Sequence, residues 1–162
     1  HFHTGYNLVA LKRFSEYSRD EDVLENIRRG FQFYRANLFT DEELPKYYHD
    51  RLYPIDIHTI AYSIITLAEF EALDKGNITL ARRILAWALK EMRGKEGYFF
   101  YQKKKLYTNR IPYMRWSQAW MLYALSTLHE HASGALPEKG AAAPEISATD
   151  DSGQAAPRET RH

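Results

Sequence analysis

Apolar residues recur every three or four positions through most of residues 1–131. This is the spacing of a helix that buries one face, so the pattern predicts an all-α fold. Five segments carry it, with these apolar faces: Leu8, Leu11 and Phe14; Val23, Ile27, Phe31 and Tyr34; Ile57, Ile60, Ile64, Leu67 and Leu73; Leu80, Ile84, Trp87 and Leu89; Trp116, Trp120, Tyr123 and Leu128. Asp20 is placed to cap the second segment, and the fourth should end near Gly94 or Gly97.

The chain also repeats with a period of about 55 residues. A His-Thr pair opens the first helix at His3 and the third at His58, 55 residues later, and Arg115 follows His58 by 57. Each unit reads as helix, short turn, helix and aromatic loop. The second such loop alternates enough from Phe99 to Tyr107 to predict a small β-hairpin. Stacked helical hairpins of this kind predict an α/α toroid or solenoid whose first, third and fifth helices form the inner row.

Composition narrows the classes of partner. The 162 residues are 44% hydrophobic, and 22 basic against 21 acidic residues give a net charge of +1, so no global field favours nucleic acid or an anionic membrane. There is no cysteine, which excludes disulfides, thiolate catalysis and cysteine-ligated metals. Apolar runs fall short of the ~20 residues of a membrane span.

The two ends of the chain differ in character. Residues 132–162 contain small, polar and proline residues and no aromatic residue, which predicts a disordered tail after a domain of residues 1–131. At the other end, His1 stands at what reads as a helix start. We therefore expect a preceding segment to be missing, along with any targeting signal in it, and we expect a cytoplasmic location.

Four stretches carry a resemblance to a known family: "HTGY", "YPIDIHTIAYSIITL", "GYFFYQ" and "YTNRIPYMRWSQAWMLYALS". From Phe2 to about His129 the chain resembles the C-terminal half of an (α/α)6 toroid of the six-hairpin glycosidase-like superfamily. It looks closest to a bacterial and archaeal branch associated with extracellular polysaccharide synthesis, some members of which are labelled delta-aminolevulinic acid dehydratase. The resemblance implies about two and a half hairpins of a larger ring, and a glycoside hydrolase-like or sugar-modifying reaction if the protein is an enzyme.

A more distant resemblance concerns the last helix. "RWSQAWMLYAL" is similar to the inner-helix motif of the unsaturated glucuronyl hydrolases, an arginine and glycine followed by a tryptophan. Here Arg115 and Trp120 are five residues apart rather than four, and Trp116-Ser117 stand where that motif has glycine. The resemblance implies only that Arg115, Gln118 and Trp120 lie on a helix facing a central cavity.

Asp56 and His58 are the candidate catalytic residues. A carboxyl group at the start of an inner helix could give or accept a proton in glycoside chemistry, but Asp56 also stands where a helix N-cap belongs. The inner faces offer no second carboxylate of the kind that a glycosidase needs. His3 and His58 occupy matching places in the repeat, where they could bind a sugar hydroxyl, pack a helix start or, least expected, hold a metal.

Substrate-binding candidates gather around Arg115. It lies three residues from Gln118, on one face of an α-helix, and arginine is suited to bidentate contact with a carboxylate. The alternative is an ion pair to Asp50 or Asp56. Further candidates have aromatic or imidazole rings that could stack on a sugar or belong to the core: His3, Tyr53, Tyr101, Tyr113, Trp116 and Trp120.

Together with the resemblance, these observations predict a protein that binds or acts on acidic sugars. A place in extracellular polysaccharide metabolism is what the resemblance implies. The expected partner is an oligosaccharide or sugar derivative, with no nucleic acid, cofactor, metal or membrane span; Lys103, Lys104 and Lys105 read as a solvated turn. The alternative is a non-catalytic helical-repeat scaffold in a polysaccharide synthesis complex. A terpenoid-cyclase-like toroid is disfavoured because the sequence has no aspartate-rich diphosphate motif.

Overall fold

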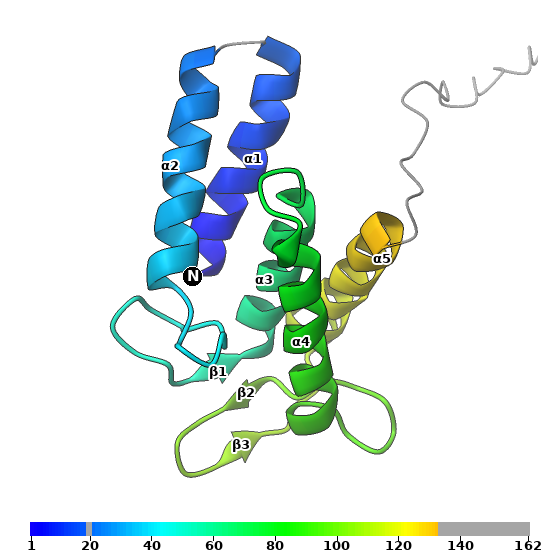
Figure 1. Cartoon of the computed structure of the whole chain (residues 1–162). Coiled ribbons are helices and arrows are strands. Elements are labelled where there is room, and N and C mark those ends of the chain that lie inside the picture. Colours follow the sequence, from blue (N-terminus) through cyan, green and yellow to red (C-terminus); the bar gives the residue numbers. More distant parts are fainter. Residues whose placement is uncertain (19–20, 133–162) are drawn as a thin grey trace, which may run out of the picture.

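The computed structural model describes residues 1–18 and 21–132, which form mainly helices with one small sheet (Figure 1). The helices are α1 (Phe2–Ser18), α2 (Glu21–Asn37), α3 (Ile57–Glu69), α4 (Gly76–Glu91), the π-helix η1 (Met114–Ala119) and α5 (Trp120–Ala132). The strands are β1 (Ile55–Asp56), β2 (Gln102–Lys103) and β3 (Thr108–Asn109). The helical class predicted from the sequence is confirmed. The tail predicted for residues 132–162 begins one residue too early, because Ala132 is the last residue of α5. The rest of that tail and the predicted Asp20 cap lie outside the described residues.

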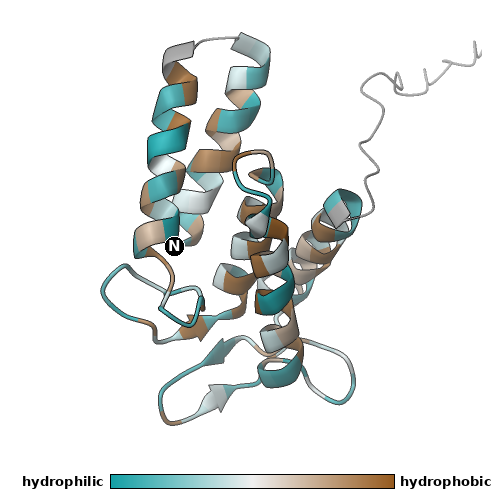
Figure 2. Ribbon diagram, viewed as in Figure 1, coloured by the Kyte–Doolittle hydropathy of each residue, from teal (hydrophilic) through white to brown (hydrophobic). Residues whose placement is uncertain are grey.

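Helix α3 is the centre of the fold, since every residue from Ile57 to Ala68 is buried. It packs against α1, α4 and α5. Two of its buried hydroxyls bond within the helix: Ser63 Oγ donates to the Thr59 carbonyl at 2.6 Å and Thr66 Oγ1 to the Tyr62 carbonyl at 2.7 Å. In Figure 2 hydrophobic residues gather where α3 meets α4, whereas the visible side of α2 is largely hydrophilic. A helix without a solvated side must be enclosed by its neighbours.

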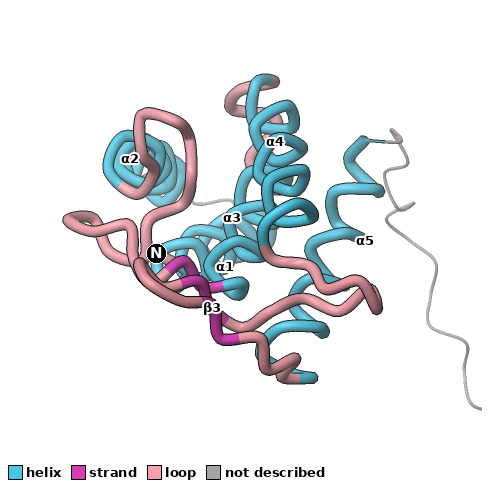
Figure 3. The backbone as a smooth tube through the Cα atoms, turned by 90° about the horizontal axis from the view of Figure 1, so that it is seen from below, coloured by secondary structure: helices cyan, strands magenta, loops and turns pink. Residues whose placement is uncertain are grey.

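The helices are arranged as stacked hairpins. Helix α2 packs on α1 and α4 packs on α3, while α3 also contacts both α1 and α5. The long loops and the strands gather at one end, and the α3–α4 turn, the end of α1 and the start of α2 lie at the other (Figures 1 and 3). Consequently the N-terminal ends of α3 and η1 lie at the loop end of the molecule. Within residues 1–18 and 21–132 no helix combines the length and apolar character of a membrane span.

Most of the predicted apolar faces are buried. This holds for Ile27, Phe31 and Tyr34 of α2, for Ile57, Ile60, Ile64 and Leu67 of α3, and for Leu80, Ile84 and Leu128 of α4 and α5. The prediction is wrong for Leu11 and Phe14, which are 41% and 55% exposed, because α1 turns Leu8 and Val9 into the core instead. Leu73 is also exposed, since α3 ends at Glu69 and leaves it in the following turn.

Helix α4 ends at Glu91, before the two glycines expected to stop it. The chain then folds back on itself: Arg93 bridges to Phe99, and the Gly94 amide donates to the Tyr98 carbonyl at 2.8 Å. Gly97 has φ 94°, a conformation that only glycine adopts readily. The glycines therefore build the turn that follows the helix.

The three strands form an antiparallel sheet in the order β1-β2-β3. Asp56 pairs with Gln102 and Gln102 pairs with Asn109. The hairpin predicted over residues 99–107 exists, although its strands are displaced to 102–103 and 108–109. Strand β1 was not predicted, because two residues directly before a helix carry no alternating pattern. The sheet attaches the second aromatic loop to the start of α3.

Gly5 allows α1 to approach α3 closely, which generates a stability prediction. A Cβ at this position would lie 2.6 Å from Thr66 Oγ1 and 2.8 Å from Tyr62 Cδ1. We expect Gly5→Ala to lower the free energy of unfolding by about 1–2 kcal/mol, since overpacking outweighs the ~1 kcal/mol gain in helix propensity. Urea unfolding measures the loss. Asn7→Ala, at an exposed position of the same helix, is the control, and equal stability of the two variants would contradict the prediction.

Candidate functional site

Asp56 connects the start of α3 to the sheet. One carboxylate oxygen accepts the His58 amide at 2.8 Å, which makes Asp56 the N-cap of α3, and the other accepts from Gln102 Nε2 at 2.6 Å. The residue is 1% exposed. The capping role foreseen from the sequence is confirmed, and both oxygens are occupied by neighbours within the chain.

Burial raises the pKa of Asp56, although hydrogen bonds from Gln102 and the His58 amide and the nearby Trp116 side chain act in the opposite direction. A carboxyl group that retains its proton more readily has the property required of a general acid. A general acid must also come within hydrogen-bonding distance of its substrate. The carboxylate of Asp56 is buried, and both of its oxygens accept hydrogen bonds from within the chain. Its catalytic role therefore stays a prediction.

His58 lies in a box of aromatic rings. Its imidazole stacks on Phe2 and on Trp120, with ring centroids 4.8 and 4.6 Å apart. Trp116 packs against it edge to face, with the centroids 4.3 Å apart. Nε2 shares a hydrogen bond with the Tyr6 hydroxyl, and Nδ1 is buried with no partner. Burial, followed by the charge of His3, lowers the pKa of His58 to about 4. The ring is therefore neutral at physiological pH.

An open cavity of about 490 Å³ lies above this box and is here called the Arg115 groove. Its walls come from η1 and the start of α5: Tyr113, Met114, Arg115, Trp116 and Trp120. Arg115 is exposed, and no hydrogen bond or ion pair joins its guanidinium to the described part of the chain. The ion pair considered for it is wrong, because Asp50 pairs with Arg51 at 2.9 Å and Asp56 bonds to Gln102.

The π-helical turn decides where Gln118 points. The amides of Ser117 and Gln118 both donate to the Tyr113 carbonyl, at 2.9 and 3.2 Å. The wider turn separates side chains that three-residue spacing would place together in an α-helix. The Gln118 amide instead binds Phe99, accepting from its N–H at 2.9 Å and donating to its carbonyl at 2.7 Å. The prediction that Gln118 shares a face with Arg115 is wrong, and Gln118 ties η1 to the aromatic loop.

The other predicted residues lie at different distances from the groove. The exposed His3 packs on Phe2 at 4.4 Å, and Tyr101 contacts the groove residue Tyr113 at 5.0 Å between ring centroids. Tyr53 is 38% exposed and contacts no ring of the site. Among the described residues no three histidine or carboxylate side chains meet as a metal site would require.

Several residues of the site were not foreseen: Phe2, Tyr6, Gln102 and Met114. In the sequence, Phe2 and Tyr6 are indistinguishable from aromatic residues that pack the start of a helix. Gln102 stands in the quoted stretch "GYFFYQ", but no periodicity distinguishes an amide that supports a buried carboxylate. Only their position in the fold gives these residues a role.

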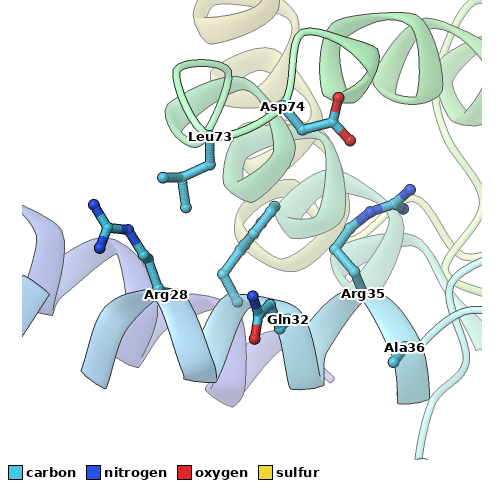
Figure 4. A pocket seen from close by; sticks show the side chains of 7 residues that line it. Arg28, Gln32, Arg35, Ala36, Leu73 and Asp74 are labelled. Carbon is cyan, nitrogen blue, oxygen red and sulfur yellow. The ribbon is translucent and has the colours of Figure 1, made fainter. Parts of the chain in front are cut away.

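A second cavity, of about 540 Å³, lies between α2 and the α3–α4 turn (Figure 4). Arg28, Gln32 and Arg35 face Leu73 and Asp74 across it. Its charges already have partners: Arg28 pairs with Glu25 at 3.7 Å, Arg35 lies over Phe39, and Asp74 accepts the Gly76 amide at 2.8 Å. None of the residues predicted from the sequence to form a site lines this cavity.

The chain was compared with protein-family models and with curated proteins, and neither comparison gives a match. The geometry of the described residues therefore carries the functional interpretation.

The neutral His58 makes stability depend on pH. The pKa of His58 is about 4 in the folded protein and 6.5 for a histidine exposed to water, as in the unfolded chain. As the pH falls, the unfolded chain therefore takes up a proton before the folded protein does. The stabilisation is complete above pH 6.5 and is lost as pH falls toward 4. Between pH 7 and pH 4.5 we expect a loss of about 2 kcal/mol in the free energy of unfolding, less than the full pKa difference gives because the titration is not complete at pH 4.5.

His58→Phe should lack this part of the pH dependence, because phenylalanine preserves the stack but cannot take up a proton. Urea unfolding at pH 7 and pH 4.5 measures the difference. The control is His49→Gln, which removes one exposed imidazole from the α2–β1 loop. The same fall in wild type and His58→Phe would contradict the assignment.

The two hydrogen bonds of Asp56 predict different effects of two substitutions. Asp56→Ala removes the cap and leaves the Gln102 amide unpaired, so we expect a loss of about 2 kcal/mol in the free energy of unfolding. Asp56→Asn keeps an acceptor for the His58 amide and should cost less than half as much. Denaturant titration at pH 7 distinguishes them, and equal losses would show that the negative charge, rather than the cap, is the important feature.

Proposed function

We propose that this chain binds an acidic sugar in the Arg115 groove. The observation that carries the proposal is Arg115, an exposed guanidinium that forms no ion pair with residues 1–18 or 21–132 and is set among Tyr113, Trp116 and Trp120. Arginine offers a planar pair of donors to a carboxylate, and aromatic faces contact the apolar face of a sugar ring. A sugar that carries a carboxylate combines both features.

The elements below the groove support a preformed site. Trp116 and Trp120 rest against the buried imidazole of His58, which Phe2 and Tyr6 enclose from α1. These rings are fixed by the packing of α1, α3 and α5 before any ligand arrives. Binding sites held by rigid elements lose less entropy when the ligand binds.

We further infer that the hairpins belong to an α/α toroid with α1, α3 and α5 in its inner row. The inference is supported by the contacts of α3 with both α1 and α5 and by the exposed residues of the two flanking helices. Phe14 and Tyr17 of α1 are 55% and 88% exposed, and Leu122 of α5 is 66% exposed. Further hairpins on either side would cover them, and the groove would open at the mouth of the ring.

A scaffold without catalysis is the second candidate, and a specific observation favours it. Asp56 and His58, the residues expected to perform chemistry, are buried and bonded to Gln102 and Tyr6. A role in extracellular polysaccharide metabolism, whether catalytic or structural, rests on the family resemblance. The two candidates differ in whether a sugar binds at all.

Arg115→Ala should weaken binding of galacturonate oligomers at least tenfold, because the loss of a charged hydrogen-bonding partner costs roughly 1.5–3 kcal/mol. Isothermal calorimetry against the galacturonate dimer measures this, and the neutral galactose dimer tests the need for a carboxylate. Arg29→Ala removes an exposed arginine of α2 and is the matched control. Absence of binding to wild type would reject the proposal in favour of the scaffold, whereas equal binding to Arg115→Ala would reject Arg115 as the anchor.

A further inference from the structure

Residues 97–129 contain no aspartate or glutamate, although they include Lys103, Lys104, Lys105, Arg110 and Arg115. This segment runs from the α4–β2 loop through the β2–β3 hairpin and the groove into α5. The chain as a whole has nearly equal numbers of acidic and basic residues. The positive charge is therefore concentrated on the hairpin and beside the groove.

Two carboxylates approach the hairpin, and both are engaged. Glu91 binds Lys103, whose ammonium group also lies 5.8 Å from the centre of the Trp87 ring. Asp56 is buried under Gln102. Lys104, Lys105 and Arg110 are exposed, and none of them forms an ion pair within the described residues. Lys104 lies over the Tyr107 ring at 5.6 Å and Arg110 over the Phe100 ring at 5.4 Å, contacts that orient these two side chains without neutralising their charge. Within the described residues no carboxylate therefore neutralises these three cations, which can still attract an external anion.

The hairpin and the Arg115 groove are connected through aromatic residues. Tyr101, at the start of the hairpin, contacts Tyr113 of the groove at 5.0 Å between ring centroids. The Tyr101 amide donates to the Asn109 carbonyl at 3.1 Å, and the Lys104 amide donates to the Tyr107 carbonyl at 2.7 Å, which closes the hairpin. Lys104 is three residues from Tyr101, about 10 Å along an extended strand. The path from the groove to the lysines is therefore longer than a disaccharide, and only a longer sugar chain held in the groove reaches them.

We propose that the ligand of the Arg115 groove is an anionic polysaccharide whose chain extends over the β2–β3 hairpin, where Lys104, Lys105 and Arg110 contact successive acidic residues. This inference rests on the proposed function and specifies its substrate class as a polymer. A monosaccharide or a nucleotide sugar would fill the groove alone and leave the hairpin cations without a role. Several anionic groups on one chain bind jointly, because the first contact raises the effective concentration of the others.

The exposed side chains along this path favour a sugar polymer over a lipid surface. Tyr107 and Tyr113 are 59% and 45% exposed and present ring faces beside the cations. Leu106 at the tip of the hairpin is 93% exposed, and Ile111 and Met114, between the hairpin and the groove, are 50% and 74% exposed. Thr108, Asn109 and Arg110 separate Leu106 from these two residues in the sequence, so this segment lacks the continuous apolar stretch with which a protein inserts into a membrane surface.

The test compares chain lengths in calorimetry, with galacturonate dimer and octamer as probes and the full chain as the protein. We expect the octamer to bind wild type at least tenfold more tightly than the dimer in 50 mM salt, with a steeper loss of affinity as salt rises. Lys104→Ala/Lys105→Ala should reduce the octamer to the affinity of the dimer while leaving dimer binding unchanged. Arg29→Ala/Lys75→Ala removes the same charge from exposed positions outside the hairpin and should change neither affinity.

The outcomes separate the two proposals. If wild type binds neither dimer nor octamer, the acidic-sugar proposal and this inference both fail. If dimer and octamer bind equally, or the double hairpin variant retains the preference for the octamer, the polymer inference alone fails. A single-stranded oligonucleotide of matched charge, or vesicles of anionic lipid, binding through the same lysines at least as tightly as the octamer would also overturn it, because the hairpin would then recognise charge or a membrane.

Discussion

The complete burial of α3 is the constraint on which the rest of the structure depends. Twelve consecutive buried residues require packing partners around the whole helix, and α1, α4 and α5 supply them. A glycine at position 5 allows the close approach of α1, and the hydroxyls of Ser63 and Thr66 bond inside the helix. The enclosure also determines where the first turn of α3 lies, and with it Asp56 and His58.

Asp56 shows how the fold and the site share one residue. Its carboxylate caps α3 and holds Gln102 of the hairpin, so two segments that lie 46 residues apart in the sequence meet at one buried group. Those bonds also withdraw the carboxylate from any ligand in the groove. The exposed Arg115 is in the opposite situation, since no hydrogen bond or ion pair joins its guanidinium to the described part of the chain. The proposed site thus consists of Asp56 and His58 as a buried support, with Arg115 and the two tryptophans lining the groove above them.

Features of the fold and the site that depend on interactions between neighbouring residues could be predicted from the sequence, and features that depend on distant residues could not. The buried faces of α2, α3 and most of α4 could be predicted because apolar residues recur there every three or four positions. The Asp56 cap could be predicted because aspartate is favoured at a helix N-cap, an interaction that lies within one turn. Leu11 and Phe14 have the same spacing but are exposed, because the periodicity of α1 does not specify which of its sides meets α3. The π-turn that separates Gln118 from Arg115 has no signature in residue spacing. Strand β1 and the Gln102 contact depend on pairing across 46 residues, which only the folded chain brings about.

The positions of the tryptophans have a practical consequence. The chain has three. Trp116 and Trp120 line the Arg115 groove, and Trp87 lies under Lys103 of the hairpin. Every indole is therefore next to the surface assigned to ligand, with none buried elsewhere to add a constant background. The intrinsic fluorescence of the unlabelled protein is accordingly a built-in optical reporter, in which emission from two indoles follows the groove and emission from the third follows the hairpin.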